Sequence, residues 1–251
     1  MNKKKKQIYQ EKYHQLYNYA KNAWHKMPIH PLNRSWHSFS FKSYSQFGED
    51  NVLRYFFSEK ECSYIDIGSG HPIIGNNSYF LYKKKNNGIL IDGIDINILR
   101  SKKLRPKDKS LNCLIGEKNE NIKFYEFIDK NFSTVVNKMA EKFSKALNEI
   151  PKVNELQIKT LDTILEGVYP SVPTLLNIDV EGNDLSVLKG IDWEKFHPRV
   201  ICIEELDFSF EKTSEIQRYL VQRNYQLISR MVYSNIYLSK NYKSKFEWNQ
   251  R

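Results

Sequence analysis

The chain has 251 residues, of which 40% are hydrophobic and 14% aromatic, so it can bury a sizeable core and is not globally disordered. Its formal net charge of +10 comes with no recognisable DNA- or RNA-binding motif, which argues against a nucleic-acid partner. No run approaches about 18 apolar residues, and the lysine-rich start lacks the apolar stretch of a secretory signal. We therefore expect a cytoplasmic protein.

The three cysteines, Cys62, Cys113 and Cys202, all lie within apolar runs. Their spacing matches neither a zinc site nor a disulfide framework. They are expected to be buried thiols in a reducing compartment.

Residues 1–43 are predicted to form an N-terminal helical extension. Aromatic and apolar residues recur at three- and four-residue steps over residues 5–26, which predicts a helix with one aromatic face. We expect this face to pack on its own domain or on a twin subunit, as in a homodimer. The lysines at positions 3–6 leave open a peripheral contact with the inner face of a membrane. Residues 28–43, with two prolines, read as an irregular connector.

Residues 44–251 alternate predicted strands with predicted helices, which indicates βαβ units and a mostly parallel sheet with an antiparallel edge from the last two strands. The expected strands cover residues 62–67, 88–92, 111–115, 122–127, 156–160, 174–179, 200–203, 225–230 and 235–238. The expected helices include one that Ser45 caps and that continues to residue 57, followed by 77–86, 97–104, 132–147, 161–165, 184–189 and 213–223.

Basic residues gather at residues 3–6, 83–85 and 102–109. The last group contains four lysines and Arg105. We interpret all three groups as solvated surface, with attraction to anionic lipid or an acidic glycan as the alternative.

A tight glycine turn follows the first sheet strand, in the sequence Asp66-Ile-Gly68-Ser-Gly70. Glycine permits positive φ angles and a close backbone approach. The next strand ends on Asp92, where a carboxylate can accept hydrogen bonds from ribose hydroxyls, with Asp95 as a second candidate. This pattern fits an adenosine-bearing cofactor, but the third glycine of a dinucleotide fingerprint is absent.

Two further acids follow predicted strand ends. Asp179 ends the apolar run 174–179 and is followed by Glu181 and Gly182, and Glu204 follows the run 200–203. Because parallel strands end at one edge of the sheet, site residues gather there. Asp179 and Glu204, together with Asp92, place acids at three strand ends, which is hard to explain as core packing.

Several blocks, taken in order, resemble the FkbM family of S-adenosylmethionine-dependent methyltransferases. They are SYSQFGED, DIGSGHP, NNSYFLYKKKNNGILID, LIGEKNENIKFYEF, TLDTIL, LLNIDVEGNDLSVLKGIDW and PRVICIEE, and YSNIY resembles the family's closing strand. The resemblance runs from Tyr44 to Leu238 and implies a methyltransferase domain over residues 44–251. The implied fold is α/β and Rossmann-like, with a seven-stranded sheet and helices on both faces.

The resemblance also implies S-adenosylmethionine as the cofactor. Asp66, Gly68 and Gly70 would line its methionine end, Asp92 would hold the ribose, and the Gly116-Glu117 turn would lie near the adenine. Asp179 would face the reacting centre. Further candidates for contact with the donor are Gln46, Asn77 and Ser78. Two segments depart from the family's usual pattern, Gly93-Ile-Asp after the second strand and Asn76-Asn77-Ser78.

Methyl transfer to a hydroxyl can require a general base, for which the candidates are Asp179, Glu181 and His71. His71 can equally be a turn histidine, whereas His197 is expected to be structural. Asp179, Glu181 and Glu204 together are candidate ligands for a divalent metal, although a metal-free site is preferred.

The predicted function is O-methylation of a hydroxyl in a sugar, surface glycan or related small molecule, as in surface-polysaccharide or natural-product pathways. Two alternatives stay open. One is an NAD(P)-dependent oxidoreductase, against which the missing third glycine counts. The other is a non-catalytic Rossmann-like module that binds lipid or protein.

Overall fold

The computed structural model describes residues 42–57, 61–167, 169–172, 174–205 and 213–242. The chain divides into two units, Met1–Lys42 and Ser43–Arg251, and the description below concerns the second. The predicted helix over residues 5–26 and nearly all of the predicted connector lie outside the described residues.

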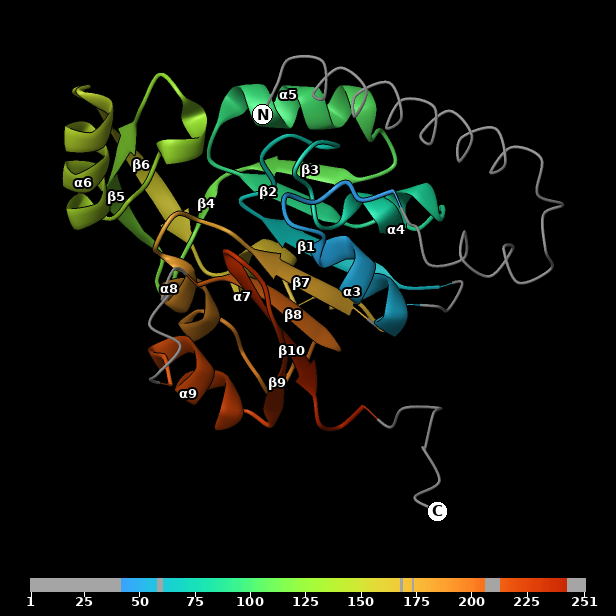
Figure 1. Ribbon diagram of the computed structural model, residues 1–251. Helices are drawn as coiled ribbons and strands as arrows, with labels where there is room; N and C mark the ends of the chain where they lie inside the picture. Colours follow the sequence, from blue (N-terminus) through green and yellow to red (C-terminus); the bar gives the residue numbers. More distant parts are fainter. Residues whose placement is uncertain (1–41, 58–60, 168, 173, 206–212, 243–251) are drawn as a thin grey trace, which may run out of the picture. The chain divides into compact units, whose positions relative to one another are not determined.

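The second unit is built on a seven-stranded sheet with the strand order β3-β2-β1-β7-β8-β10-β9 (Figure 1). The strands are β1 (Ser63–Ile67), β2 (Ile89–Asp92), β3 (Lys109–Asn112), β7 (Thr174–Ile178), β8 (Val200–Glu204), β9 (Tyr225–Arg230) and β10 (Ser234–Ser239). The first five pair in parallel, and β10 pairs antiparallel with both β8 and β9. The predicted α/β fold with an antiparallel edge is confirmed.

Alternate residues of the strands pack into two hydrophobic cores, one on each face of the sheet. Ile65 and Ile67 of β1 belong to one core, whereas Tyr64 belongs to the other. The first core is closed by α7 (Leu161–Leu165), α8 (Asp184–Lys189) and α9 (Glu215–Val221). The second is closed by α3 (Glu49–Phe56) and α4 (Tyr79–Lys83). Because every residue of β7 and β8 is buried, apolar runs rather than alternating patterns mark these central strands.

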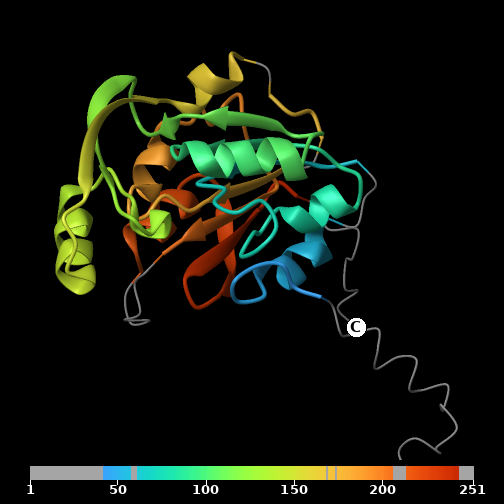
Figure 2. The same ribbon diagram turned by 90° about the horizontal axis from the view of Figure 1, so that it is seen from above.

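A second, three-stranded sheet lies to the side of the main sheet in both views (Figures 1 and 2). It contains β4 (Leu114–Ile115), β5 (Glu120–Glu126) and β6 (Lys152–Lys159). Helix α6 (Asn137–Leu147) connects β5 to β6, after a single 3-10 turn, η1 (Lys130–Phe132).

This second sheet corrects three sequence predictions. The expected strand over residues 111–115 is two strands, because the chain leaves the main sheet after Asn112 and pairs with β6 from Leu114. The expected helix over 132–147 begins only at Asn137, since Thr134 forms an isolated bridge with Tyr125. The expected linker over 148–154 contributes its last residues to β6.

Helix boundaries differ elsewhere for local reasons. Helix α4 is shorter than the predicted 77–86 because the side-chain oxygen of Asn76 accepts from the amides of Ser78 and Tyr79, which keeps this turn out of the helix. Helix α5 (Asp95–Leu104) begins earlier than predicted and packs against β2 and β3 (Figure 2). Gly48, with φ of 90°, is the N-cap of α3, so the prediction of Ser45 at that position is wrong. Ser45 Oγ nevertheless accepts from the Asp50 amide in the first turn.

His197 is structural, as predicted. Its ring stacks on Tyr225 and its Nε2 lies 3.0 Å from Ser239 Oγ. Within the described residues, no helix combines the length and the apolar character needed to cross a membrane.

Candidate functional site at the carboxyl edge of the sheet

The carboxyl ends of four parallel strands bring the predicted site residues to one edge of the main sheet. The glycine turn follows β1, Asp92 ends β2, Asp179 follows β7, and Glu204 ends β8. In the register of β7 and β8, Ile178 pairs with Ile203, which places Asp179 and Glu204 at neighbouring strand ends.

The glycine turn after β1 depends on the absence of side chains. Gly68 has φ of +73°, and a Cβ atom there would lie 1.7 Å from the carbonyl oxygen of Asp179. Its amide donates to Ile91 O at 2.9 Å, which fixes the turn against β2 as well. Gly70, with φ of +54°, differs, because a Cβ there would meet no atom within 4 Å. The turn is therefore closed at Gly68 and open at Gly70.

Asp92 is 6% exposed and lies under this turn. Its Oδ2 accepts from the Gly70 amide at 2.8 Å and from Asn97 Nδ2 at 3.1 Å, and its Oδ1 accepts from the Ile94 amide at 2.8 Å. Burial raises the pKa of this carboxyl group. Since a carboxylate offers about four lone-pair positions, one acceptor position on Oδ1 is left after these three bonds. Asp95 is exposed in the first turn of α5.

Asp66 is fully buried and bonded on both oxygens by side chains of the protein. Oδ1 accepts from Asn177 Nδ2 at 2.8 Å, which follows from the pairing of these two residues across β1 and β7. Oδ2 accepts from Asn76 Nδ2 at 3.0 Å and from Ser78 Oγ at 2.5 Å. This geometry makes Asp66 and Ser78 parts of the support beneath the glycine turn.

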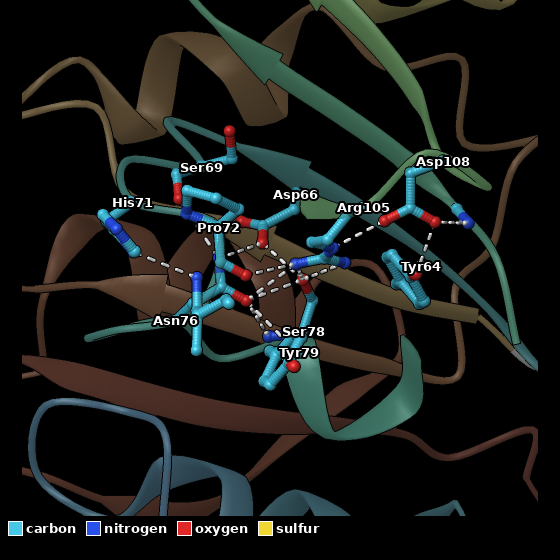
Figure 3. A network of polar contacts seen from close by, with 12 residues as sticks. Tyr64, Asp66, Ser69, His71, Pro72, Asn76, Ser78, Tyr79, Arg105 and Asp108 are labelled. Carbon is cyan, nitrogen blue, oxygen red and sulfur yellow. Dashed lines mark hydrogen bonds and ion pairs between the residues drawn. The ribbon is translucent and has the colours of Figure 1, made fainter. Parts of the chain in front are cut away.

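Arg105 completes that support, and the sequence did not reveal it (Figure 3). Its side chain is fully buried, so the prediction that the basic group at 102–109 is solvated is wrong at this position. Nε donates to Asp108 Oδ2 at 2.6 Å, and Nη1 donates to Pro72 O at 3.2 Å and to Ser78 Oγ at 3.1 Å. Tyr64 donates to the other oxygen of Asp108 at 2.6 Å. The sequence signal was weak: one arginine among lysines, with an aspartate three positions later.

His71 caps a turn of the chain. Its Nδ1 accepts from the amides of Ile73 and Ile74, at 3.2 and 3.1 Å. The neutral ring must then carry its proton on Nε2, so neither nitrogen offers a free lone pair. Partial burial and the nearby Arg100 charge also lower the pKa of His71. The geometry favours the turn-histidine interpretation over a general base.

The other residues predicted to contact the methyl donor lie at three different places. Asn77 Nδ2 donates to Asn177 Oδ1 at 3.0 Å, and so belongs to the support with Asp66. Gln46 is exposed before α3. Gly116 is buried at the end of β4, where a Cβ would lie 2.5 Å from Ile158 Cδ1, and the exposed Glu117 donates its amide to Ser186 Oγ of α8 at 3.1 Å.

Three acids converge beside the glycine turn. One carboxylate oxygen from each of Asp179, Glu181 and Glu204 lies within 4.8 Å of the other two. Glu181 has φ of +53°, a left-handed conformation that is uncommon outside glycine and that recurs at functional sites. The neighbouring Asp184 differs from these three acids, because its two carboxylate oxygens accept from the backbone amides of Val180 and Gly182, each at 3.1 Å.

Burial is the main cause that raises the pKa values of these acids, and their mutual repulsion adds to it. The pKa of Asp179 rises to about 6, and that of Glu181 to about 8. The pKa of Glu204 rises to about 10, through burial and then repulsion from Asp179. The pKa of Asp179 is thus raised least of the three, so Asp179 is the member of the cluster best placed to accept a proton.

The segment between β4 and β6 also reaches this cluster. Thr134 Oγ1 donates to the carbonyl oxygen of Glu181 at 2.8 Å, and a Cβ on Gly182 would lie 3.1 Å from Met139 Cγ. Neither contact could be predicted from local sequence, because each joins residues more than 40 positions apart.

Two of the cavities among the described residues lie outside this cluster. One of about 630 Å³ lies at the amino ends of β1 and β2, the opposite edge of the sheet, with Lys85, Lys107 and Lys109 in its lining. The other, of about 230 Å³, lies beyond Asp92 and is lined by residues that include Gly93, Asn112 and Cys113. Only the second adjoins the carboxyl edge.

Comparison with known proteins identifies a family and a solved structure of similar fold. Residues 66–227, more than half of the chain, match the family described as methyltransferase FkbM domain. Among solved structures, a methyltransferase FkbM from Methylobacillus flagellatus KT is similar, with 14% sequence identity and a TM-score of 0.47. The similarity covers 78% of this chain and 48% of that chain, so this chain spans about half the length of that protein. No curated protein matches.

Proposed function

The chain belongs to the FkbM methyltransferase family, and from this premise we propose that it is an S-adenosylmethionine-dependent O-methyltransferase. Its acceptor is a hydroxyl of a sugar, a surface glycan or a related metabolite. The observation that carries the proposal is the close approach of Gly68 to the Asp179 carbonyl. This approach sets the predicted donor turn directly against the acid cluster.

The residues of the turn fit the proposed donor. Space is open where a side chain at position 70 would lie, so a ligand can approach the backbone there. The acceptor position left on Asp92 Oδ1 suits a ribose hydroxyl. The glycine turn is held by Asn76, whose Nδ2 donates to the Ser69 carbonyl of the turn and to Asp66. Ser78 also donates to Asp66, and Arg105 donates to Asn76 and Ser78.

When bound, S-adenosylmethionine supplies an electrophilic methyl group on sulfur. The protein's part is to align a hydroxyl with that group, exclude water and accept the hydroxyl proton. Asp179 is the residue we assign to the proton, because it adjoins the turn and has a pKa raised to about 6 by burial and neighbouring acids. Glu181, with a pKa raised to about 8, is largely protonated near neutrality and lies beside it.

Calorimetric titration with S-adenosylmethionine, S-adenosylhomocysteine and NAD tests the donor. We expect binding of the first two, and at least about tenfold weaker binding by Asp92→Asn, which corresponds to about 1.4 kcal/mol. Asp95→Asn is the matched control, because Asp95 is exposed three positions further on. Binding of NAD alone would overturn the proposal.

Transfer of label from tritiated S-adenosylmethionine tests the acceptor class. Nucleotide-activated sugars, oligosaccharides and simple alcohols should be compared with amines and carboxylic acids. We expect label only in hydroxyl compounds, and a slower turnover for Asp179→Asn with nearly unchanged donor affinity. Label in amines or acids alone would contradict O-methylation, and an equal loss of donor affinity in the Asp92 and Asp179 variants would contradict the assigned roles.

A further inference from the structure

We propose that Asp179, Glu181 and Glu204 together bind one hard divalent cation such as Mg²⁺. The sequence left this site open while preferring a metal-free one. The proposed function supplies only the role of the cation in methyl transfer. The arrangement of the three acids does not depend on the methyl donor.

The spacing of the three carboxylates suits an oxygen-ligated cation. Their ligand atoms all lie within 4.8 Å of one another. In an octahedral site with bonds of about 2.1 Å, neighbouring ligands are about 3 Å apart and opposite ligands about 4.2 Å apart; Ca²⁺, with bonds of about 2.4 Å, widens the latter to about 4.8 Å. Small side-chain rotations therefore bring the three oxygens into range, with water or an acceptor oxygen in the remaining positions.

Glu204 gives a second and independent indication. The residue is 9% exposed, and its Oε2 is buried with no hydrogen-bond partner. A buried carboxylate oxygen without a partner is costly, and native proteins seldom leave one in that state. Since another side chain does not satisfy it, a ligand held between Glu204 and the two acids opposite is the simplest partner.

Basic side chains do not serve this purpose in the part of the chain that the structure describes. The ion pairs there join Arg54 to Asp50, Arg105 to Asp108, Lys130 to Glu126, and Lys195 to Asp192, and none involves the three acids. Asp184, the fourth acid nearby, is already satisfied by two backbone amides. Among the described residues, Asp184 therefore has backbone partners on both oxygens, whereas Asp179, Glu181 and Glu204 have no ion-pair partner.

The strand ends give the cation a defined place relative to the donor turn. Asp179 adjoins Gly68 through its carbonyl oxygen, and its carboxylate shares the cluster with Glu204. A cation there would stand beside the donor turn and offer a positive contact to the oxygen of the acceptor hydroxyl, which favours the ionised hydroxyl. Asp179 would bind the cation through one carboxylate oxygen, and its other oxygen would accept the proton that the hydroxyl loses. The substrate class that this predicts is an acceptor with an oxygen free to enter the coordination shell.

Titration of the metal-stripped full chain with Mn²⁺, followed by loss of the free-ion electron paramagnetic resonance signal, tests the site without donor or acceptor. We expect one bound ion per chain, displaced by Mg²⁺. Glu204→Gln and Asp179→Asn should each weaken Mn²⁺ binding by at least about tenfold. Glu205→Gln is the matched control, because the adjacent Glu205 carboxylate already accepts from Asn235 and Tyr237.

Circular dichroism of each variant establishes that it is folded before the titration is interpreted. Absence of Mn²⁺ binding by the folded wild type, or equal binding by wild type and Glu204→Gln, would overturn the cation site. The same samples, titrated with S-adenosylmethionine in EDTA, report on the donor separately. Donor binding without Mn²⁺ binding removes only the cation proposal, whereas Mn²⁺ binding without donor binding removes only the proposed function.

Discussion

Gly68 has both a left-handed backbone conformation and a close contact with Asp179 of the candidate site. Its positive φ excludes most side chains, and its contact with Asp179 leaves no room for a single methyl group. The same chemical change made at Gly167, which also has a positive φ, meets no atom within 4 Å. These two glycines therefore separate the cost of left-handed backbone from the cost of steric overlap.

We predict that Gly68→Ala destabilises the fold by about 3 kcal/mol or more, because strain and overlap add. Gly167→Ala should cost only about 1–2 kcal/mol, the cost of the left-handed conformation alone. Urea denaturation followed by circular dichroism measures both. Equal losses of stability in the two variants would show that the Asp179 contact relaxes at little cost.

The thiol of Cys113 provides a test of the local environment beside Asp92. Burial raises its pKa to about 11, although the Lys159 charge acts in the opposite direction. At pH 8 the thiolate fraction is then about 100- to 250-fold smaller than for a cysteine with the ordinary pKa of about 8.5 to 9. We predict slow alkylation of Cys113 by iodoacetamide at pH 8, with a rate that still rises about tenfold for each pH unit up to pH 10. Peptide mass spectrometry checks this, and a rate that levels off near pH 9 would contradict it.

The positions of the candidate residues in the fold were predictable from sequence only where position along a strand sufficed. Asp92 and Glu204 end their strands as expected, and Asp179 directly follows one. Arg105 was interpreted as surface because its burial depends on Tyr64, Ser78 and Asp108 being brought together in space. His71 could not be assigned, since the choice between base and turn cap depends on the direction of one ring nitrogen.

At the scale of elements, one buried arginine joins the end of α5 to β1 and to the loop before α4. Arg105 also lies over the rings of Tyr64 and Tyr82, at 5.0 and 5.3 Å from their centroids. The planar guanidinium has five donors spread over three nitrogens, whereas the three donors of a lysine ammonium all lie on one atom and cannot reach the same set of acceptors. The glycine turn after β1 is therefore positioned by an interaction between elements as well as by its own glycines.

We predict that Arg105→Lys lowers the stability of the fold by about 3 kcal/mol, because Asp108 and Ser78 lose buried partners. Lys103→Ala is the control from the same helix, where an exposed side chain should change stability by less than about 0.5 kcal/mol. Thermal and urea unfolding of both variants measure the difference. If Arg105→Lys changed the free energy of unfolding as little as Lys103→Ala does, the lysine ammonium group would be replacing the hydrogen bonds of the guanidinium.

For the whole molecule, the alternation of strands and helices was enough to predict a mostly parallel sheet, and the antiparallel last pair was predicted as well. The three-stranded sheet was not, because the pairing of β5 with β6 joins Glu120 to Ile158, and local sequence does not encode such a register. The helix 161–165 and the helix 184–189 were predicted at their observed bounds, since turns and buried strands delimit both.

We predict two levels of hydrogen-exchange protection across the described residues. Amides of β7 and β8, in which every residue is buried, should exchange only through global unfolding. Amides of β5 and β6, in which most residues are partly or fully exposed, should exchange faster through local opening. Mass spectrometry of peptic fragments resolves the two groups, and equal protection would show that both sheets unfold as one cooperative unit.

The segment that forms the second sheet leaves and rejoins the rest of the unit at adjacent points. The Gly116 amide donates to the Lys159 carbonyl at 2.9 Å, so the exit and the return of the chain are hydrogen-bonded to each other. Insertions and deletions between these two residues need not shift the strands of the main sheet. Thr134 and Met139 of this segment contact the Glu181-Gly182 turn. Changes confined to this one segment can therefore alter the wall of the acid cluster without any change in the glycine turn or Asp92.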